Sequence, residues 1–146
     1  MCDLANRSIV LNKLENRFKI INEDIKNLDN VLEHKYYDAI VTNPPYKKTN
    51  SGIVNCCSDL AIARHEIMCT LEDIIRVSFQ LLKTGGSFYM IHKAERLADI
   101  ICTLRKFKLE PKVIKFQFTE NEAKLVLIKA IKDAKDFCKI YKWKDN

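Results

Sequence analysis

The segment YYDAIVTNPPYKKTN, residues 36–50, carries the strongest indication of the fold. Residues 37–41 are typical of a strand that runs into a protein interior. Pro44 and Pro45 then end the strand, because proline cannot donate a ladder hydrogen bond and fixes φ. The two prolines also make the following loop rigid and bias Asn43 away from helical geometry. The segment therefore predicts a buried strand with a fixed polar corner at its carboxyl end.

Working outward from this strand, apolar periodicity and turn residues predict an alternation of helices and strands. Strands that alternate with helices imply crossover connections, a mostly parallel sheet and helices on both of its faces. The last two strands are joined by a tight polar turn, which adds one antiparallel strand near the C-terminus. Glycines 85 and 86 are expected to end the third helix. The expected helices are 3–14, 25–32, 58–82 and 95–107, and the expected strands are 18–21, 36–42, 87–92, 111–118 and 124–131.

Polar residues follow two of the expected strands at their carboxyl ends. Asn22-Glu23-Asp24 follows the strand at 18–21, and Asn43-Pro44-Pro45-Tyr46 follows the strand at 36–42. Ligands of open α/β sheets bind outside the carboxyl ends of the strands. We therefore expect both groups to lie at a ligand-binding edge.

The composition is that of one globular domain, with 146 residues, 47% hydrophobic and 30% charged side chains. No apolar run approaches the roughly 18 residues that span a bilayer, and the N-terminus lacks the pattern of a secretory signal. A cytoplasmic protein with no membrane contact is expected. Its six cysteines show no metal-ligand spacing and are interpreted as free thiols, and no metal site is expected.

The chain is basic, with a net charge of +6 and an isoelectric point near 9.0. This charge permits a polyanionic partner such as RNA or DNA. A lysine-rich composition without any nucleic-acid partner explains the charge equally well. The charge balance alone therefore does not decide the partner.

The polar corner offers two hydrogen-bond acceptors and one aromatic face. These are the side-chain oxygen of Asn43, the carbonyl of Pro44 and the ring of Tyr46. They suit a planar group that carries an NH₂, because acceptors for both hydrogens favour a tetrahedral nitrogen with its lone pair free to attack. Stacking on Tyr46 would contribute roughly 1–3 kcal/mol. The alternative is a strand-ending turn in which Asn43 caps its own backbone.

The segment YDAIVTNPPY resembles a motif of class I S-adenosylmethionine-dependent methyltransferases that act on exocyclic or amide nitrogens. Residues 63–101 resemble more narrowly the tRNA adenine-N6 methyltransferases that modify valine tRNA beside the anticodon, and the likeness covers nearly the whole chain. The resemblance implies a partial Rossmann-like methyltransferase domain over residues 1–131, followed by a charged tail over 132–146. It implies S-adenosylmethionine as cofactor and tRNA as substrate.

In this resemblance, the motif residues Asn43, Pro44, Pro45 and Tyr46 become catalytic. The amide and the first proline carbonyl would hold the target amine, and the tyrosine would pack on the base. The same NPPY chemistry also serves methylation of glutamine N5 in a protein substrate, and DNA amine methylation is a further option. The segments after residue 60 favour tRNA.

The resemblance also implies a cofactor contact at the end of the preceding strand. Asp24 would contact the cofactor adenine, with Ile25 and Asn43 beside it. For Asp24 the alternative is an N-cap of the short helix that follows.

Three basic residues are candidates for contact with RNA phosphate, namely Lys47, Lys48 and Arg64. Ordinary surface charges are the alternative for each of them. His92 and Arg96 also resemble positions of the family, without an assigned role.

The family fold has elements that this sequence lacks. Its first two strands and the glycine-rich loop that holds the cofactor are absent, since the glycines (Gly52, Gly85 and Gly86) form no GxG pattern. In the family those strands lie in the middle of the sheet, so their loss leaves exposed edges. We expect a complementing chain or self-association across such an edge, and weak or no cofactor binding by the chain alone. The remaining alternative is a non-enzymatic remnant that binds RNA weakly.

Overall fold

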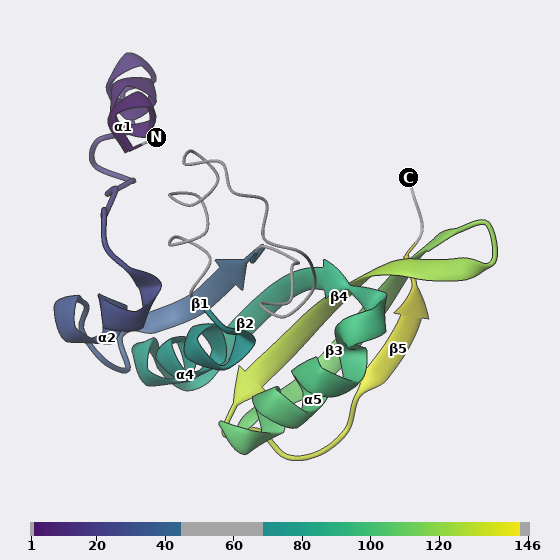
Figure 1. Cartoon of the computed structure of the whole chain (residues 1–146). Coiled ribbons are helices and arrows are strands. Elements are labelled where there is room, and N and C mark those ends of the chain that lie inside the picture. Colours follow the sequence, from purple (N-terminus) through teal and green to yellow (C-terminus); the bar gives the residue numbers. More distant parts are fainter. Residues whose placement is uncertain (1, 45–68, 144–146) are drawn as a thin grey trace, which may run out of the picture.

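The computed structural model describes residues 2–44 and 69–143 of the chain. The described residues form one five-stranded sheet with helices and short 3₁₀ turns (Figure 1). In chain order the elements are α1 (Cys2–Leu11), the 3₁₀ turn η1 (Ile25–Asn27), α2 (Leu28–Val31), β1 (Tyr37–Thr42), α4 (Leu71–Leu81), β2 (Leu82–Lys93), the 3₁₀ turn η2 (Ala94–Arg96), α5 (Leu97–Lys106), β3 (Leu109–Thr119), β4 (Glu122–Lys132) and β5 (Lys139–Lys142).

The strands are arranged in the order β1-β2-β4-β3-β5. β1 pairs in parallel with β2, and β3 pairs in parallel with β5. β4 lies between β2 and β3 and pairs antiparallel to both. Four strands therefore run in one direction and β4 runs against them, which confirms the expectation of a mostly parallel sheet with one antiparallel strand near the C-terminus.

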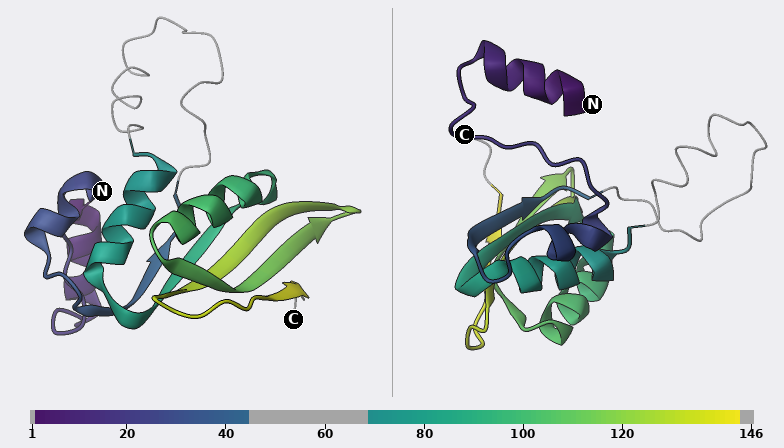
Figure 2. Two further views of the ribbon diagram at one scale, coloured as in Figure 1. Left: turned by 90° about the horizontal axis from the view of Figure 1, so that it is seen from below. Right: turned by 90° about the vertical axis from the view of Figure 1, so that its left-hand side faces the viewer.

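The core lies between this sheet and the helices α4 and α5, which cover the same face (Figures 1 and 2). Alternate residues of each strand point into it, as β-strand geometry requires; Phe88, Met90, Val126 and Ile128 are buried. α4 begins with a capping box, in which the Thr70 hydroxyl accepts from the amide of Asp73 and the Asp73 carboxylate accepts from the amide of Thr70. The cap and the buried stripe of α4 fix this helix against the sheet.

The end of α4 differs from the prediction. The helix ends at Leu81 and β2 starts at Leu82, whereas Gly85 and Gly86 lie inside β2. Gly85 has φ +79°, and a Cβ on Gly86 would lie 2.8 Å from the carbonyl oxygen of Lys83. The glycines therefore form an irregularity in the β1–β2 pairing, where the register shifts between Tyr37 and Ala39.

The last carbonyls of α4 bind a buried lysine instead. Lys132, at the end of β4, is 2% exposed, and its ammonium donates to the carbonyl oxygens of Phe79 (2.5 Å) and Leu82 (2.8 Å). A cation suits the negative end of a helix dipole. One lysine thus links the end of α4 to β4.

The N-terminal part of the chain packs loosely. No residue between 2 and 43 is buried, including all of α1. Residues 18–21 form no strand, so the prediction of a strand there is wrong. An apolar run becomes a strand only when a neighbouring strand supplies hydrogen bonds, and within the described sheet β1 pairs with β2 alone. Phe18 is 52% exposed.

The segment 132–146, expected to be a charged tail, contains the edge strand β5. Its amides and carbonyls pair with β3 between Val113 and Phe116. Among residues 2–44 and 69–143, no helix has the length and apolar character needed to cross a membrane.

Candidate active site

The carboxyl ends of β1 and β2 lie side by side. Thr42, the last residue of β1, pairs with Met90 of β2, so the parallel register brings Asn43 and Pro44 level with Ile91 and His92. Asn43 is exposed, whereas Pro44 is buried. The strand ends where the prolines were expected to end it, and burial of Pro44 anchors the corner that presents Asn43.

His92 places a neutral imidazole at this edge. The residue is 4% exposed, and its Nδ1 accepts from the backbone amide of Lys93 at 2.9 Å. Burial lowers the pKa of His92 below its ordinary value of 6.5, and the cation of Arg96 lowers it further. Because Nδ1 accepts, the neutral ring carries its proton on Nε2. Arg96 is itself held by Asp99, whose Oδ2 lies 2.7 Å from its Nε.

Asp24 caps the 3₁₀ turn η1. Its Oδ1 accepts from the backbone amide of Lys26 at 2.9 Å, and the residue is exposed. The alternative weighed for Asp24, an N-cap, is therefore what the structure contains. Oδ2 accepts no hydrogen bond from a described residue, so the cap leaves one carboxylate oxygen available to a ligand.

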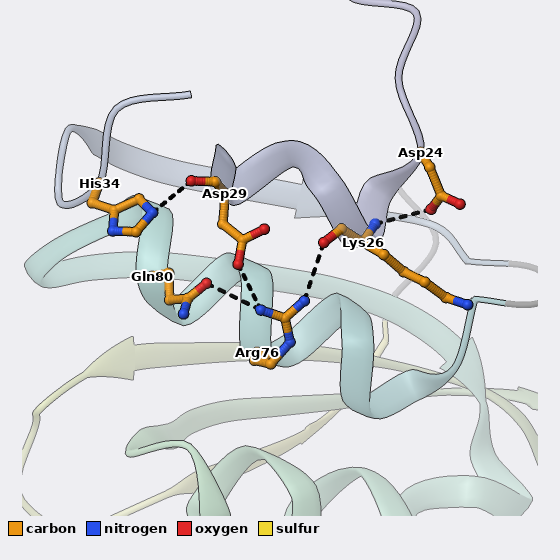
Figure 3. A network of polar contacts seen from close by, with 6 residues as sticks. All are labelled: Asp24, Lys26, Asp29, His34, Arg76 and Gln80. Atoms are coloured by element: carbon orange, nitrogen blue, oxygen red, sulfur yellow. Dashed lines mark hydrogen bonds and ion pairs between the residues drawn. The ribbon is translucent and has the colours of Figure 1, made fainter. Parts of the chain in front are cut away.

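A polar network holds η1 and α2 against α4 (Figure 3). Arg76 of α4 donates through Nη1 to Asp29 Oδ2 at 2.6 Å and to Gln80 Oε1 at 3.2 Å, and through Nη2 to the carbonyl of Lys26 at 3.2 Å. His34 Nε2 donates to the carbonyl of Asp29 at 2.6 Å. This network fixes the segment that carries Asp24 and Ile25.

Sequence reasoning missed the Arg76–Asp29 pair, and the local sequence points elsewhere. Glu72 and Asp73 precede Arg76 by four and three residues, the usual spacing of helical ion pairs. Glu72 instead binds Lys106 at 2.6 Å and Asp73 caps its own helix, so Arg76 is available to a partner 47 residues away. One indication of a buried partner was present in the sequence, because Arg76 lies between the apolar residues Ile75 and Val77.

An apolar cavity of about 250 Å³ lies between η1, α2, β1 and α4. Ile25, the neighbour of Asp24, and Thr42, the neighbour of Asn43, both line it, so the cavity lies between η1 and the carboxyl end of β1. Its described lining contains no charged side chain; it comprises Ile25, Leu28, Leu32, Tyr37, Ile40, Val41, Thr42, Ile74, Val77, Ser78 and Leu81.

The side chains at this edge suit one end of a purine-containing cofactor. The open oxygen of Asp24 can accept from an exocyclic amine, and Ile25 supplies an apolar wall beside it. No cradle for the ribose or for the charged amino-acid portion lies within the described residues of this edge. Among the described residues, Asp24 and Ile25 therefore offer groups for the adenine end of such a cofactor.

The thiol near this corner is not an activated nucleophile. Burial raises the pKa of Cys69, and the carboxylates of Asp73 and Asp24 raise it further. Cys69 thus stays protonated at neutral pH.

The remaining expected site residues, Pro45, Tyr46, Lys47, Lys48 and Arg64, lie outside the described residues. Of the others, Ile25 lines the cavity that ends beside Asn43, and Asp24 adjoins Ile25. Their roles in binding and catalysis remain predictions.

No protein-family model matches the chain. In sequence it is similar to a tRNA1(Val) (adenine(37)-N6)-methyltransferase from Porphyromonas gingivalis, with 27% identity over 100 residues. The match covers 67% of this chain but only 38% of the relative. The chain thus spans well under half of the curated relatives that it matches.

Two solved methyltransferase structures show the same fold at low identity. A predicted O-methyltransferase from Agrobacterium tumefaciens superposes with a TM-score of 0.71 and 18% identity, covering 97% of this chain and 62% of that structure. A geranyl diphosphate C-methyltransferase from Streptomyces coelicolor gives a TM-score of 0.58 and 12% identity, covering 90% of this chain and 60% of that structure. The chain has the α/β fold of class I S-adenosylmethionine-dependent methyltransferases and shares weak sequence similarity with an adenine-N6 enzyme of that class.

Proposed function

We propose that this chain carries the amine-binding side of an S-adenosylmethionine-dependent methyltransferase that modifies N6 of an adenine in tRNA. The observation that carries the proposal is the position of Asn43 and Pro44. They follow β1 at the carboxyl edge of a methyltransferase-type sheet, next to a cavity and to the buried His92. Similarity to the P. gingivalis tRNA enzyme supports adenine as the acceptor.

In this proposal the chain binds and orients the amine. The side-chain oxygen of Asn43 and the carbonyl of Pro44 accept the two N6 hydrogens, which localises the nitrogen lone pair for attack. Pro45 keeps the corner rigid and Tyr46 stacks on the base. The cofactor, when bound, supplies an electrophilic methyl group, and Asp24 and Ile25 would hold its adenine.

Lys47, Lys48 and Arg64 are proposed to contact tRNA phosphates. The net charge of +6 is compatible with an anionic substrate, since cationic side chains displace the counterions that surround nucleic acid. The fold does not identify the atom that is methylated, because similar folds occur in an O-methyltransferase and a C-methyltransferase. The proposal of an amine as methyl acceptor therefore rests on the motif at residues 43–46.

A reconstituted enzyme tests this function. The chain is fused to the part of the P. gingivalis enzyme outside the 100 matched residues, and N6-methyladenosine formation in a valine-tRNA transcript is followed by mass spectrometry. Asn43→Ala should lower the methylation rate by about 10²–10³-fold, the usual effect of removing one preorganised polar group. The exposed Asn30, replaced by alanine, is the matched control and should leave the rate unchanged.

Parallel assays use a glutamine-containing release-factor peptide and a DNA duplex. Methylation of either of these in preference to tRNA would replace the proposed substrate. Equal rates for Asn43→Ala and the parent fusion would remove Asn43 from the mechanism.

A further inference from the structure

The last strand of the sheet alternates cationic with apolar and aromatic side chains. β5 and the residue after it have the sequence KIYKW, residues 139–143, which contains no acidic residue. All four residues of β5 are exposed, and the exposed fraction of Tyr141 is 45%. Lysines on an edge strand discourage further pairing, but that purpose does not require an exposed tyrosine between them. The tyrosine therefore indicates a further role for this strand.

The strand registers place these side chains on one face together with lysines of β3 and β4. Tyr141 lies in register with Lys115 of β3. Lys139 lies in register with Val113 of β3, which pairs with Lys129 of β4. The alternate residues of β3 and β4 are buried in the core, so this set points away from α4 and α5. Lys115, Lys129, Lys139 and Tyr141 are called the β5 surface below.

The lysines of the β5 surface have no acidic partner among the described residues. None of the three forms an ion pair with a carboxylate of residues 2–44 or 69–143. The ammonium of Lys129 lies over the ring of Tyr89, 5.5 Å from its centroid. Three cations whose charge is not neutralised within the described fold favour an anionic partner. Four other lysines do form ion pairs, namely Lys83, Lys93, Lys106 and Lys124.

We propose that the β5 surface binds an unpaired stretch of tRNA, with its three lysines on phosphates and the ring of Tyr141 stacked on a base. The proposal rests on the proposed function and adds a second contact to the same substrate. Aromatic side chains stack on RNA bases that are splayed out of a helix, and lysines beside them follow the phosphate backbone. An acidic protein segment would use the lysines but would leave the ring without a planar partner.

The position of β5 separates this contact from the methylated base. β1 and β5 run in the same direction, so their carboxyl ends lie at the same edge of the sheet. They are the two outer strands (Figure 1), four strand spacings or about 19 Å apart. An RNA whose adenine reaches Asn43 must therefore extend over several nucleotides to reach Tyr141. The β5 surface should contribute to tRNA affinity and not to the chemical step.

Binding of a valine-tRNA transcript to the intact chain, measured by fluorescence anisotropy at several salt concentrations, tests the lysines. The double variant Lys115→Gln/Lys139→Gln should bind more weakly. It should also reduce the slope of log affinity against log salt by about 1.4, because two phosphate contacts to an unpaired strand are lost. The matched control is Lys19→Gln/Lys108→Gln, which removes two exposed lysines outside the β5 surface and should leave the slope unchanged.

The stacking contact is tested in the same assay. Tyr141→Ala should weaken binding at least about fivefold, the lower bound for loss of one stacked base. Tyr141→Phe keeps the ring and should bind as the parent does. Ile140→Ala shortens an exposed side chain on the other face of β5, so it controls for loosening of the strand and should leave binding unchanged.

Three outcomes overturn the proposal. They are an unchanged salt slope in the lysine double variant, equal losses in Tyr141→Ala and Ile140→Ala, and a dimer of the chain, seen by sedimentation, that Tyr141→Ala breaks. The last result would make the β5 surface a contact between copies of the chain.

Methylation by the fusion described above is measured separately. The lysine double variant should raise the KM for tRNA and leave kcat unchanged. Binding that depends on the β5 surface, without methylation by the parent fusion, keeps the β5 surface and rejects the proposed function. Methylation with an unchanged KM in the lysine double variant does the reverse.

Discussion

Burial decides the protonation state of His92. The unfolded chain binds a proton at this residue near the ordinary pKa of 6.5, whereas the folded chain binds it only at lower pH, because burial and Arg96 disfavour the cation. The folded state therefore binds fewer protons than the unfolded state below pH 6.5. The free energy of unfolding should rise with pH up to about 6.5 and fall as the pH drops below it, by at most about 1.4 kcal/mol per pH unit.

Urea unfolding between pH 5 and 7.5 measures this dependence. His92→Asn retains an acceptor for the amide of Lys93 and removes the titration, so its stability should vary less over that window. A variant with the full pH dependence of the parent would assign the effect to another group.

At the residue scale, the position of Asn43 directly after a strand was predictable from the sequence, and the burial of His92 was not. The two prolines that follow Asn43 predict that the strand ends there, and this signal lies within three residues of sequence. His92 lies near the end of β2, next to Val126 of β4, which is distant in sequence. The residues that neighbour His92 in the sequence therefore do not predict its burial.

At the element scale, α4 depends on Lys132 for its C-terminal end. Lys132→Met should destabilise the fold by about 1–3 kcal/mol, because the carbonyls of Phe79 and Leu82 lose their buried donor. Thermal or urea unfolding measures the change. The control is Lys129→Met on the opposite face of the same strand, where the ammonium lies over Tyr89, with an expected change below about 1 kcal/mol. Equal losses in both variants would show that the cap has no special contribution.

The Arg76 network is the second element-scale contact that can be tested. Arg76→Leu leaves the half-buried Asp29 without its cation and removes the bridge to Lys26. We expect a loss of about 1–3 kcal/mol, concentrated in faster hydrogen exchange of η1 and α2. Gln80→Leu removes only the weaker 3.2 Å contact of Arg76 and should change the exchange little. Undisturbed exchange in Arg76→Leu would mean that apolar packing alone holds these elements.

The periodic elements followed their sequence signals closely, and the exceptions have physical causes. Apolar periodicity predicted a helix over 58–82, and the structure has α4 over Leu71–Leu81, whereas residues 58–68 lie outside the described residues. Residues 18–21 failed as a strand because pairing, and not the apolar run itself, makes a strand. Gly85 and Gly86 are helix-ending residues by sequence, yet the strand pairing uses them for a bulge.

At the scale of the whole molecule, cofactor affinity should be low. The described site provides Asp24 and Ile25 for one end of the cofactor, with no cradle for the remainder. Titration calorimetry of S-adenosylmethionine into the chain alone should therefore show no binding at micromolar concentrations. The fusion with the unmatched part of the P. gingivalis enzyme should bind it more tightly. Micromolar binding by the chain alone would place a complete pocket within residues 1–146.

The sequence by itself determined the alternation of helices and strands from β1 to β4, the single antiparallel strand and the end of β1 before the prolines, because these depend on local periodicity and on proline geometry. Only the tertiary structure decided that Asp24 caps η1 and that Lys132 caps α4. The same holds for the Arg76–Asp29 pair and for the lack of buried residues between positions 2 and 43. Those features join residues far apart in the chain, and their energies depend on burial and on partners that no local pattern encodes.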